Sequence, residues 1–186
     1  MPAEQGTILL AIARAAIANA LGRPMQADES ASWLLAPGAT FVTLTQRGAL
    51  RGCIGSLEAH RPLLEDVKAN ARASAFRDPR FKPLTAEELD ATQVEVSLLS
   101  PQRQLTFRDE QEALAQLRPL IDGVVFECDR YRSTFLPQVW EQLPSKEDFI
   151  RHLKLKAGLA PGFWANDVKL SCYTVEKWKE YKEYAA

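Results

Sequence analysis

Apolar residues recur every three or four positions in several stretches, the spacing typical of an amphipathic helix. Over residues 7–21 this spacing predicts a helix that Gly22 and Pro24 end. A second apolar stripe follows Pro62 and must stop by Asp78, because the residue before a proline is biased out of the helical region. Shorter patterns, several opened by capping residues, predict further helices over residues 85–89, 109–117, 137–140, 145–158 and 178–184.

Other stretches alternate apolar and polar residues, which is typical of strands with one buried face. Val42 and Leu44 alternate with threonines, and a second extended run over residues 50–57 follows Gly48, so the two runs predict a hairpin. Similar runs predict strands over residues 94–98, 124–126, 131–136 and 168–175. Because helices and strands are interleaved without a strict βαβ period, the predicted fold class is α+β, with a mainly antiparallel or mixed sheet flanked by helices.

Composition narrows the class of protein but not its chemistry. The chain has 186 residues, of which 46% are hydrophobic and 25% charged, as expected for one ordinary globular domain. Its 23 Lys and Arg against 24 Asp and Glu leave a net charge of −1. Because no overall positive field would attract phosphate backbones or anionic lipid, nucleic acid is an unlikely partner class.

The cysteines and histidines indicate a reducing compartment and form no metal-binding motif. Cys53, Cys128 and Cys172 are widely spaced and odd in number, which favours reduced thiols in the cytoplasm. The two histidines, His60 and His152, form no zinc-binding pattern, so we expect no metal and no cofactor.

The apolar N-terminal stretch carries an arginine and ends well short of a membrane-spanning length, so no membrane association is expected.

The most unusual segment is Leu50-Arg51-Gly52-Cys53-Ile54-Gly55, where two glycines interrupt a strand. A glycine inside a strand marks a bulge, or a close approach of backbone or ligand. If the strand is regular, Arg51 and Cys53 share a face about 7 Å apart, and the guanidinium would favour a nucleophilic thiolate. The alternative is that Cys53 is a small apolar core residue. Pairing the thiol with His60 would require a sharp bend in the chain.

Three further places carry candidate binding or catalytic groups. Asp78 and Arg80, in the turn Asp78-Pro79-Arg80-Phe81, could present a carboxylate and a guanidinium to a ligand, or could simply stabilise the turn. Glu95 is either a solvent-facing residue of a one-sided sheet or an acid that faces a cleft. Thr134 and Gln138 flank a strand-to-helix corner, a common place both for binding groups and for caps.

Remaining candidates look structural. Cys128 and Cys172 alternate with apolar residues and are predicted to be buried. Trp140 and Trp164 lie near turns and could form a recognition surface, although aromatic residues are core material first. His152, between charged neighbours on its predicted helix, is expected to be solvated.

Taken together, these segments resemble the AMMECR domain family, whose prokaryotic members are called AmmeMemoRadiSam system protein A. The resemblance covers nearly the whole chain and rests on several motifs in order: Leu50-Arg51-Gly52-Cys53-Ile54-Gly55, Asp78-Pro79-Arg80-Phe81, Glu95-Val96-Ser97, Asp122-Gly123, Thr134-Phe135-Leu136-Pro137-Gln138-Val139, Lys156-Ala157-Gly158-Leu159 and Trp164.

The resemblance implies a single AMMECR-type domain over residues 1–186, with a larger and a smaller lobe, in a cytosolic setting. It also implies association with a Memo-type protein and a radical S-adenosylmethionine (SAM) protein as a three-part system, but no established reaction. We therefore expect an accessory module whose cleft, lined by residues 50–55 and by the turns at Asp78 and Thr134, binds a partner or a small ligand. The alternative is a thiol-dependent enzyme with Cys53 as nucleophile, Arg51 lowering its pKa and Glu95 or Asp78 as orienting acid.

Overall fold

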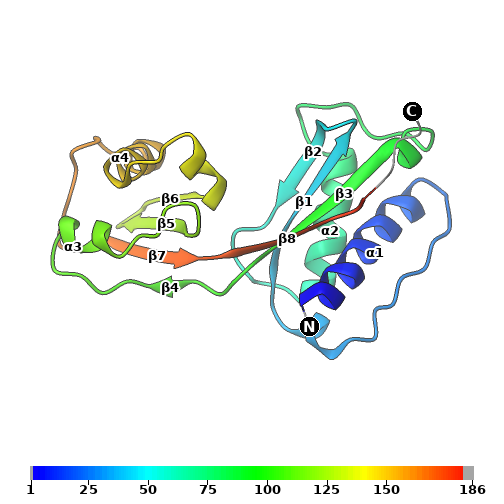
Figure 1. Ribbon diagram of the computed structural model, residues 1–186, viewed down its shortest axis with the longest axis horizontal. Helices are drawn as coiled ribbons and strands as arrows, with labels where there is room; N and C mark the ends of the chain where they lie inside the picture. Colours follow the sequence, from blue (N-terminus) through cyan, green and yellow to red (C-terminus); the bar gives the residue numbers. More distant parts are fainter. Residues whose placement is uncertain (1, 182–186) are drawn as a thin grey trace. The chain divides into compact units, whose positions relative to one another are not determined.

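The chain forms two compact units, seen here in a computed structural model that describes residues 2–181 (Figure 1). The first unit joins the residues up to Leu99 with those from Glu176 onward, and the second unit is Ser100–Val175. Each unit contains helices and one four-stranded sheet, and the β1–β2, β1–β3, β4–β7, β5–β6 and β5–β7 pairings are antiparallel. The predicted α+β class is confirmed.

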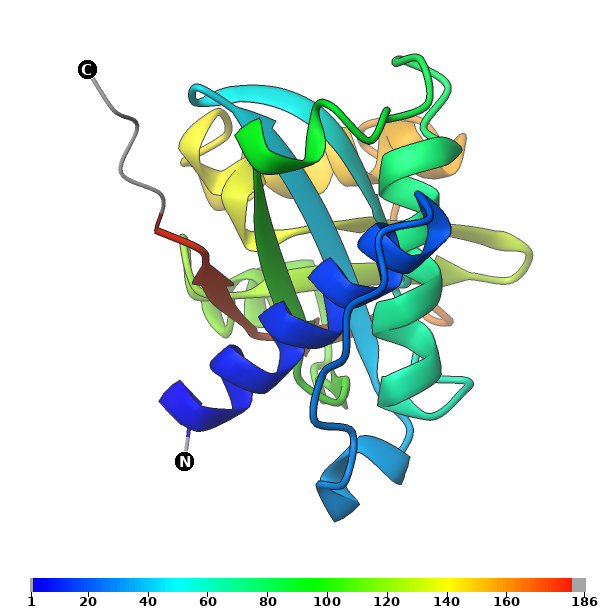
Figure 2. The ribbon, with the colours of Figure 1, turned by 90° about the vertical axis from the view of Figure 1, so that its right-hand side faces the viewer.

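In the first unit, two helices lie on one face of the sheet (Figure 2). The strand order is β2-β1-β3-β8, so β2 is an edge strand. The elements are α1 (Pro2–Ala20), η1 (Ser32–Leu35), β1 (Ala39–Gln46), β2 (Ala49–Gly55), α2 (Leu63–Phe76), η2 (Leu89–Ala91), β3 (Thr92–Leu99) and β8 (Val175–Lys179). The hairpin and both long helices agree with the patterns in the sequence.

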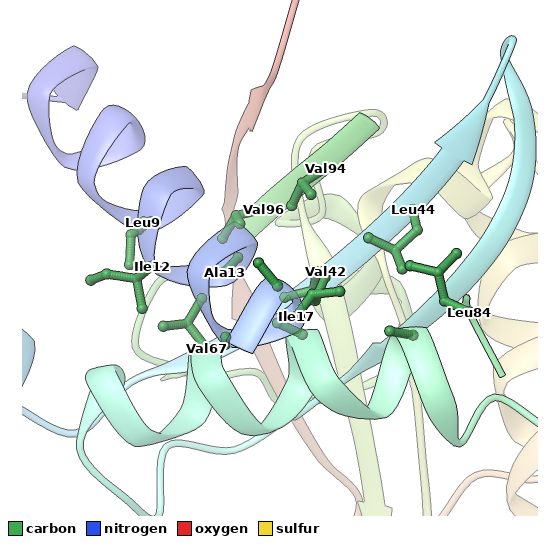
Figure 3. Packing of buried hydrophobic residues seen from close by; sticks show 14 of the residues in the cluster. Leu9, Ile12, Ala13, Ile17, Val42, Leu44, Val67, Leu84, Val94 and Val96 are labelled. Atoms are coloured by element: carbon green, nitrogen blue, oxygen red, sulfur yellow. The ribbon is translucent and has the colours of Figure 1, made fainter. Parts of the chain in front are cut away.

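The core of the first unit is built from the alternation that predicted its strands. Val42 and Leu44 of β1 and Val96 of β3 are completely buried and point toward the helices (Figure 3). There they meet Ile12 of α1 and Val67 of α2, which belong to the same apolar cluster. Burying side chains of this size contributes about 1.5–3 kcal/mol each, so this layer holds sheet and helices together.

A buried polar network also joins sheet and helix in the first unit. The carboxylate of Asp66, on α2, accepts hydrogen bonds from the Thr40 backbone and hydroxyl, from Ser56 Oγ, from Asn70 Nδ2 and from Arg61 Nε, at 2.6–3.0 Å. Asp66 itself has no exposed surface. Because every donor around it is used, this carboxylate has a structural role.

The prediction of a helix over residues 178–184 is wrong for the part of this segment that the structure describes. Residues 175–179 form strand β8, next to β3, while Tyr184 lies outside the described residues. The ring of Trp178 lies against Gly6 of α1, where an added Cβ would come within 2.2 Å of it. Pairing with β3 and this contact with α1 favour a strand here. They outweigh the helical preference indicated by three aromatic residues spaced three apart.

The second unit contains a sheet of order β4-β7-β5-β6. Its elements are β4 (Arg103–Gln104), α3 (Glu110–Ala115), β5 (Gly123–Cys128), β6 (Tyr131–Phe135), η3 (Pro137–Glu141), α4 (Lys146–Ala157) and β7 (Lys169–Tyr173). Helix α4 packs against β5 and β6, and in the core the rings of Trp140 and Phe149 stack 3.7 Å apart.

In the second unit, the structure confirms the helix caps that were predicted from neighbouring residues. The side chains of Asp109 and Ser145 cap α3 and α4, and α4 ends at Gly158 in a left-handed conformation, as their positions predicted. Cys128 and Cys172 are buried, as expected from their places in β5 and β7. Over residues 2–181, no helix combines the length and the apolar character needed to cross a membrane.

Candidate functional site

The segment around Cys53 contains a β-bulge. Leu44 pairs with Gly52 but Thr45 pairs with Leu50, so Arg51 is the extra residue on β2. The strand is therefore not regular, and the period-two argument that placed Arg51 beside Cys53 does not hold. The Arg51 guanidinium instead donates to both carboxylate oxygens of Glu88, at 3.0 and 3.1 Å.

Both glycines of this segment allow close packing within the first unit. A Cβ on Gly52 would lie 2.1 Å from the backbone oxygen of Ser74, on α2. A Cβ on Gly55 would lie 2.2 Å from the ring of Phe41. Of the alternatives that the sequence left open, the bulge and the close approach of protein atoms therefore account for these glycines without a ligand.

The turn that contains Asp78 and Arg80 holds the main chain of Cys53. Asp78 Oδ2 accepts from the Cys53 N–H at 2.9 Å, and an Arg80 nitrogen donates to the Cys53 carbonyl at 3.4 Å. Arg80 also donates to both oxygens of Asp78, at 3.0 and 2.8 Å. The hydrogen bond from Arg80 holds the pKa of the buried Asp78 carboxyl far below its usual range. We call Cys53, Asp78 and Arg80 the Cys53 clamp.

Phe81, in the same turn, lies close to two guanidinium groups. Its ring centroid is 5.5 Å from the Arg80 Cζ and 5.9 Å from the Arg51 Cζ, both within cation–π range. The hydrogen bond from Arg51 lowers the pKa of Glu88 to about 2. Both arginines are thus neutralised by a neighbouring carboxylate, so the surroundings of Cys53 carry balanced charges.

The thiol itself points to the sheet face opposite the helices. Cys53 Sγ lies 3.2 Å from Thr43 Oγ1, its cross-strand partner, and Thr43 alternates with the buried residues of β1. On its other side Thr43 is paired with Glu95 of β3, so Cys53, Thr43 and Glu95 form a row across three strands. Thr43 was missed from sequence because the row depends on strand register.

The Cys53 clamp also covers part of an exposed sheet edge. At β2 the Cys53 N–H is bound by Asp78 at 2.9 Å, and the Cys53 carbonyl is bound by Arg80 at 3.4 Å. Backbone groups that are occupied in this way cannot pair with a strand from another chain. Any partner of this surface would therefore contact side chains.

The other predicted binding residues belong to the second unit. Thr134 Oγ1 lies 3.1 Å from the hydroxyl of Tyr173, which donates to the Phe135 carbonyl at 3.2 Å. Burial raises the pKa of Tyr173, a residue that the sequence did not single out. Gln138 is exposed at the start of η3. The cleft expected to join Thr134 and the Cys53 segment stays a prediction.

Metal-ligating side chains do not gather in the part of the chain that the structure describes: residues 2–181 contain no group of three or more His, Cys, Asp or Glu suited to hold an ion. His60 is exposed, and the ring of His152, also exposed, hydrogen-bonds the carbonyl of Asp148.

These features define a two-unit α+β protein with a glycine-flanked cysteine held by an Asp-Pro-Arg-Phe turn. The AMMECR1 family model matches residues 10–178. The chain is similar to protein MJ0810 of Methanocaldococcus jannaschii, with 36% identity over 186 residues that cover 95% of this chain and 90% of the relative. A Thermotoga maritima protein is also 36% identical, over 85% of this chain and 88% of its own length.

The fold is shared with a solved relative as well. The crystal structure of the uncharacterized protein PH0010 from Pyrococcus horikoshii has a TM-score of 0.80 and 34% identity, and covers 95% of this chain and 92% of that one. The chain belongs to the AMMECR1 family.

Proposed function

We propose that this protein is an accessory binding module, and that the surface around the Cys53 clamp contacts a partner protein or a small ligand. The observation that carries the proposal is the engagement of the charged groups around Cys53. Asp78 holds a backbone N–H and Arg80, and Arg51 is paired with Glu88. Side chains held in this way give a rigid, preorganised surface, whereas a catalytic acid or base must be free to exchange a proton.

The partners that we propose are a Memo-type protein and a radical SAM protein, in the cytoplasm. Support for them comes from membership in the family, because the resemblance to its prokaryotic members implies a three-part system with these two proteins. The exposed part of the surface fits a protein contact. Arg80 has 55% of its side chain exposed and is backed by the half-buried ring of Phe81, and arginine and aromatic residues are enriched in interface hot spots.

A matched pair of variants tests the proposal. The chain is co-expressed with the Memo-type and radical SAM proteins of the same genome, and complexes are measured by size-exclusion chromatography and by titration. Arg80→Gln should weaken binding by about thirtyfold or more, the loss typical of a hot-spot residue. The control is Arg118→Gln, because Arg118 is 54% exposed and also pairs with a fully buried aspartate, Asp122, but lies in the second unit.

Two results would overturn the proposal. The first is the absence of any complex, together with no shift in melting temperature across a panel of metabolites. The second is an equal loss of binding in Arg80→Gln and Arg118→Gln. Melting temperatures of both variants are measured in parallel, so that a loss of fold is not read as a loss of contact.

A thiol-dependent enzyme is the second candidate, because Cys53 is the accessible cysteine. Cys53 is half-buried, whereas Cys128 and Cys172 are buried. Burial raises the pKa of the Cys128 thiol, and it raises the pKa of the Cys172 thiol to about 11. Iodoacetamide should therefore label Cys53 first. Labelling well below pH 8.5, the ordinary thiol range, would favour an activated nucleophile, while protection of Cys53 until unfolding would return it to a packing role.

A further inference from the structure

The second unit contains an open cavity of about 810 Å³, which the proposed function does not use. This volume lies within the range of about 300–1,000 Å³ found for small-molecule sites. Three segments form its walls: the start of α3, one side of α4 and the turn that follows α4. The lining residues are Asp109, Glu110, Gln111, Leu114, Glu147, Arg151, Lys154, Pro161, Gly162 and Trp164.

A buried lysine connects these three walls. Lys154 of α4 has only 2% of its side chain exposed, although a lysine is rarely buried unless it is paired. Its ammonium group donates to Glu110 of α3 and to the Pro161 carbonyl, and it lies 5.4 Å from the ring centroid of Trp164. The three N–H groups of an ammonium thus have a carboxylate, a carbonyl and an aromatic face. Lys154 positions the walls and has no donor left for a ligand.

Three of the polar groups left for a ligand are carboxylate oxygens. Asp109 uses Oδ1 to accept from the Glu112 N–H at 2.8 Å, Glu147 uses Oε2 for Ser145 Oγ at 3.1 Å, and Glu110 uses Oε1 for Lys154. Within residues 2–181, the second oxygen of each of these three carboxylates has no hydrogen-bond partner.

The charges of the lining point the same way. Three lining residues are acidic and two are basic, so the lining carries a net negative charge. Lys154 is paired with Glu110, and Arg151 donates to Asp148 at 2.9 Å. Because acidic side chains outnumber basic ones and keep unused acceptors, the lining favours a cation over an anion.

We propose that this cavity binds an aliphatic cation, a primary ammonium or guanidinium group on a methylene stem. The cation would sit between Asp109 and Glu147, and the stem would lie on the apolar surfaces of Leu114, Pro161 and Trp164. Two sources supply this chemistry: a free linear polyamine, or a lysine or arginine side chain of a peptide. Because the site lies in the second unit, it stands or falls independently of the Cys53 surface.

The test is titration of the full-length chain with two probes, followed by calorimetry and by the NMR signal of the Trp164 indole N–H. The probes are spermidine and a blocked tripeptide with a central lysine. Saturable binding of either one, with a shift of the Trp164 signal, supports the proposal and shows which source is preferred. An α,ω-diol of matching length and the acetylated lysine peptide, which lack the charge, should not bind.

Variants then connect the binding to the carboxylates. Glu147→Gln and Asp109→Asn should each weaken binding about threefold, the size expected for partly exposed charges, and asparagine keeps the α3 cap. Glu141→Gln is the matched control, since Glu141 is exposed in the same unit but does not line the cavity. The proposal is overturned if neither probe binds at millimolar concentration, if the uncharged probes bind equally well, or if Glu141→Gln weakens binding as much as Glu147→Gln.

Discussion

Both units contain a buried aspartate held by a half-exposed arginine, but the polar groups around the two pairs are used differently. In the first unit, Asp78 also binds the backbone of Cys53, and Asp66, at the other end of α2, is saturated by donors. In the second unit, Asp122 is bound by Arg118, yet the carboxylates around the α3–α4 cavity each keep an unused oxygen.

This contrast separates a sequence signature from a binding cavity. The glycine-flanked cysteine segment attracts attention in the sequence, but its glycines are explained by packing against Ser74 and Phe41. The α3–α4 cavity is lined by residues that form no motif. The glycines that the fold cannot exchange and the residues that line the cavity are therefore different sets, and stability measurements can tell them apart.

The largest expected effect comes from the saturated network of the first unit. Asp66→Ala removes the acceptor for buried donors of Thr40 and Asn70 and should lower the free energy of unfolding by about 4 kcal/mol. Asp90→Ala, at a side chain that is 78% exposed, should change it by less than about 0.5 kcal/mol. Urea denaturation followed by circular dichroism measures both. Similar losses for the two variants would contradict the structural role of Asp66.

A pair of glycine substitutions compares packing in the two units. Gly52→Ala should cost about 2–3 kcal/mol, because its Cβ would overlap the Ser74 carbonyl, a backbone atom that cannot move away easily. Gly162→Ala, in the wall of the cavity, meets nothing within 4 Å and should be within about 0.5 kcal/mol of the wild type. Thermal unfolding is sufficient as a measurement. A stable Gly52→Ala protein would reopen the possibility that the glycine serves a ligand.

Acid should destabilise the first unit. The folded pKa of Glu88, about 2, lies below its ordinary value of 4.5 because Arg51 stabilises the carboxylate. Such a group contributes stability above the unfolded pKa and loses it as the pH falls through the folded pKa. Between pH 5 and pH 2 the loss attributable to Glu88 should be about 1–2 kcal/mol after solvent screening, and Glu88→Gln should remove that part. An unchanged acid profile in Glu88→Gln would count against the Arg51–Glu88 pair.

Alkali should destabilise the second unit, by a smaller amount. Burial raises the pKa of Cys172 from 9.0 to about 11, so the folded state keeps a proton that the unfolded chain has lost. Its contribution is present below pH 9 and declines as the pH rises toward 11, by about 1 kcal/mol. Cys172→Ala should show a shallower decline over this range, measured by urea titration. Cys53→Ala is the comparison, because it removes a thiol from the first unit instead of the second.

Much of the fold could be predicted because its signals are local. The caps of α3 and α4, the hairpin turn at Gly48 and the end of α2 before Pro79 all depend on neighbouring residues. The fold class and the burial of two cysteines also follow from the patterns along the chain. Strand β8 was missed because its conformation depends on pairing with β3 and on contact with α1, far away in the sequence.

The candidate site was predicted only in part, for the same reason. Cys53, Asp78 and Arg80 were each singled out from sequence, and the structure brings them together through backbone hydrogen bonds. The bulge at Arg51 depends on register with β1, so nothing in residues 50–55 alone could show that Arg51 turns toward Glu88. Lys154 was missed because a lysine in the last turn of a charged helix is typical of a solvated surface.

The chain leaves the first unit after Leu99 and returns to it at Glu176, and this order affects how the protein is made. Glu180 binds Arg14 of α1 and both backbone groups of Val94 on β3. Translation adds about 5–20 residues per second, so synthesis of the second unit takes several seconds. Only then is the closing segment, from Glu176 onward, made. During that interval the β3 edge of a nascent chain lacks its native partner, and Arg14 has the carbonyls of Leu89 and Thr92 but not Glu180. Until the closing segment has been made, that edge of the nascent chain is open to pairing with the wrong strand.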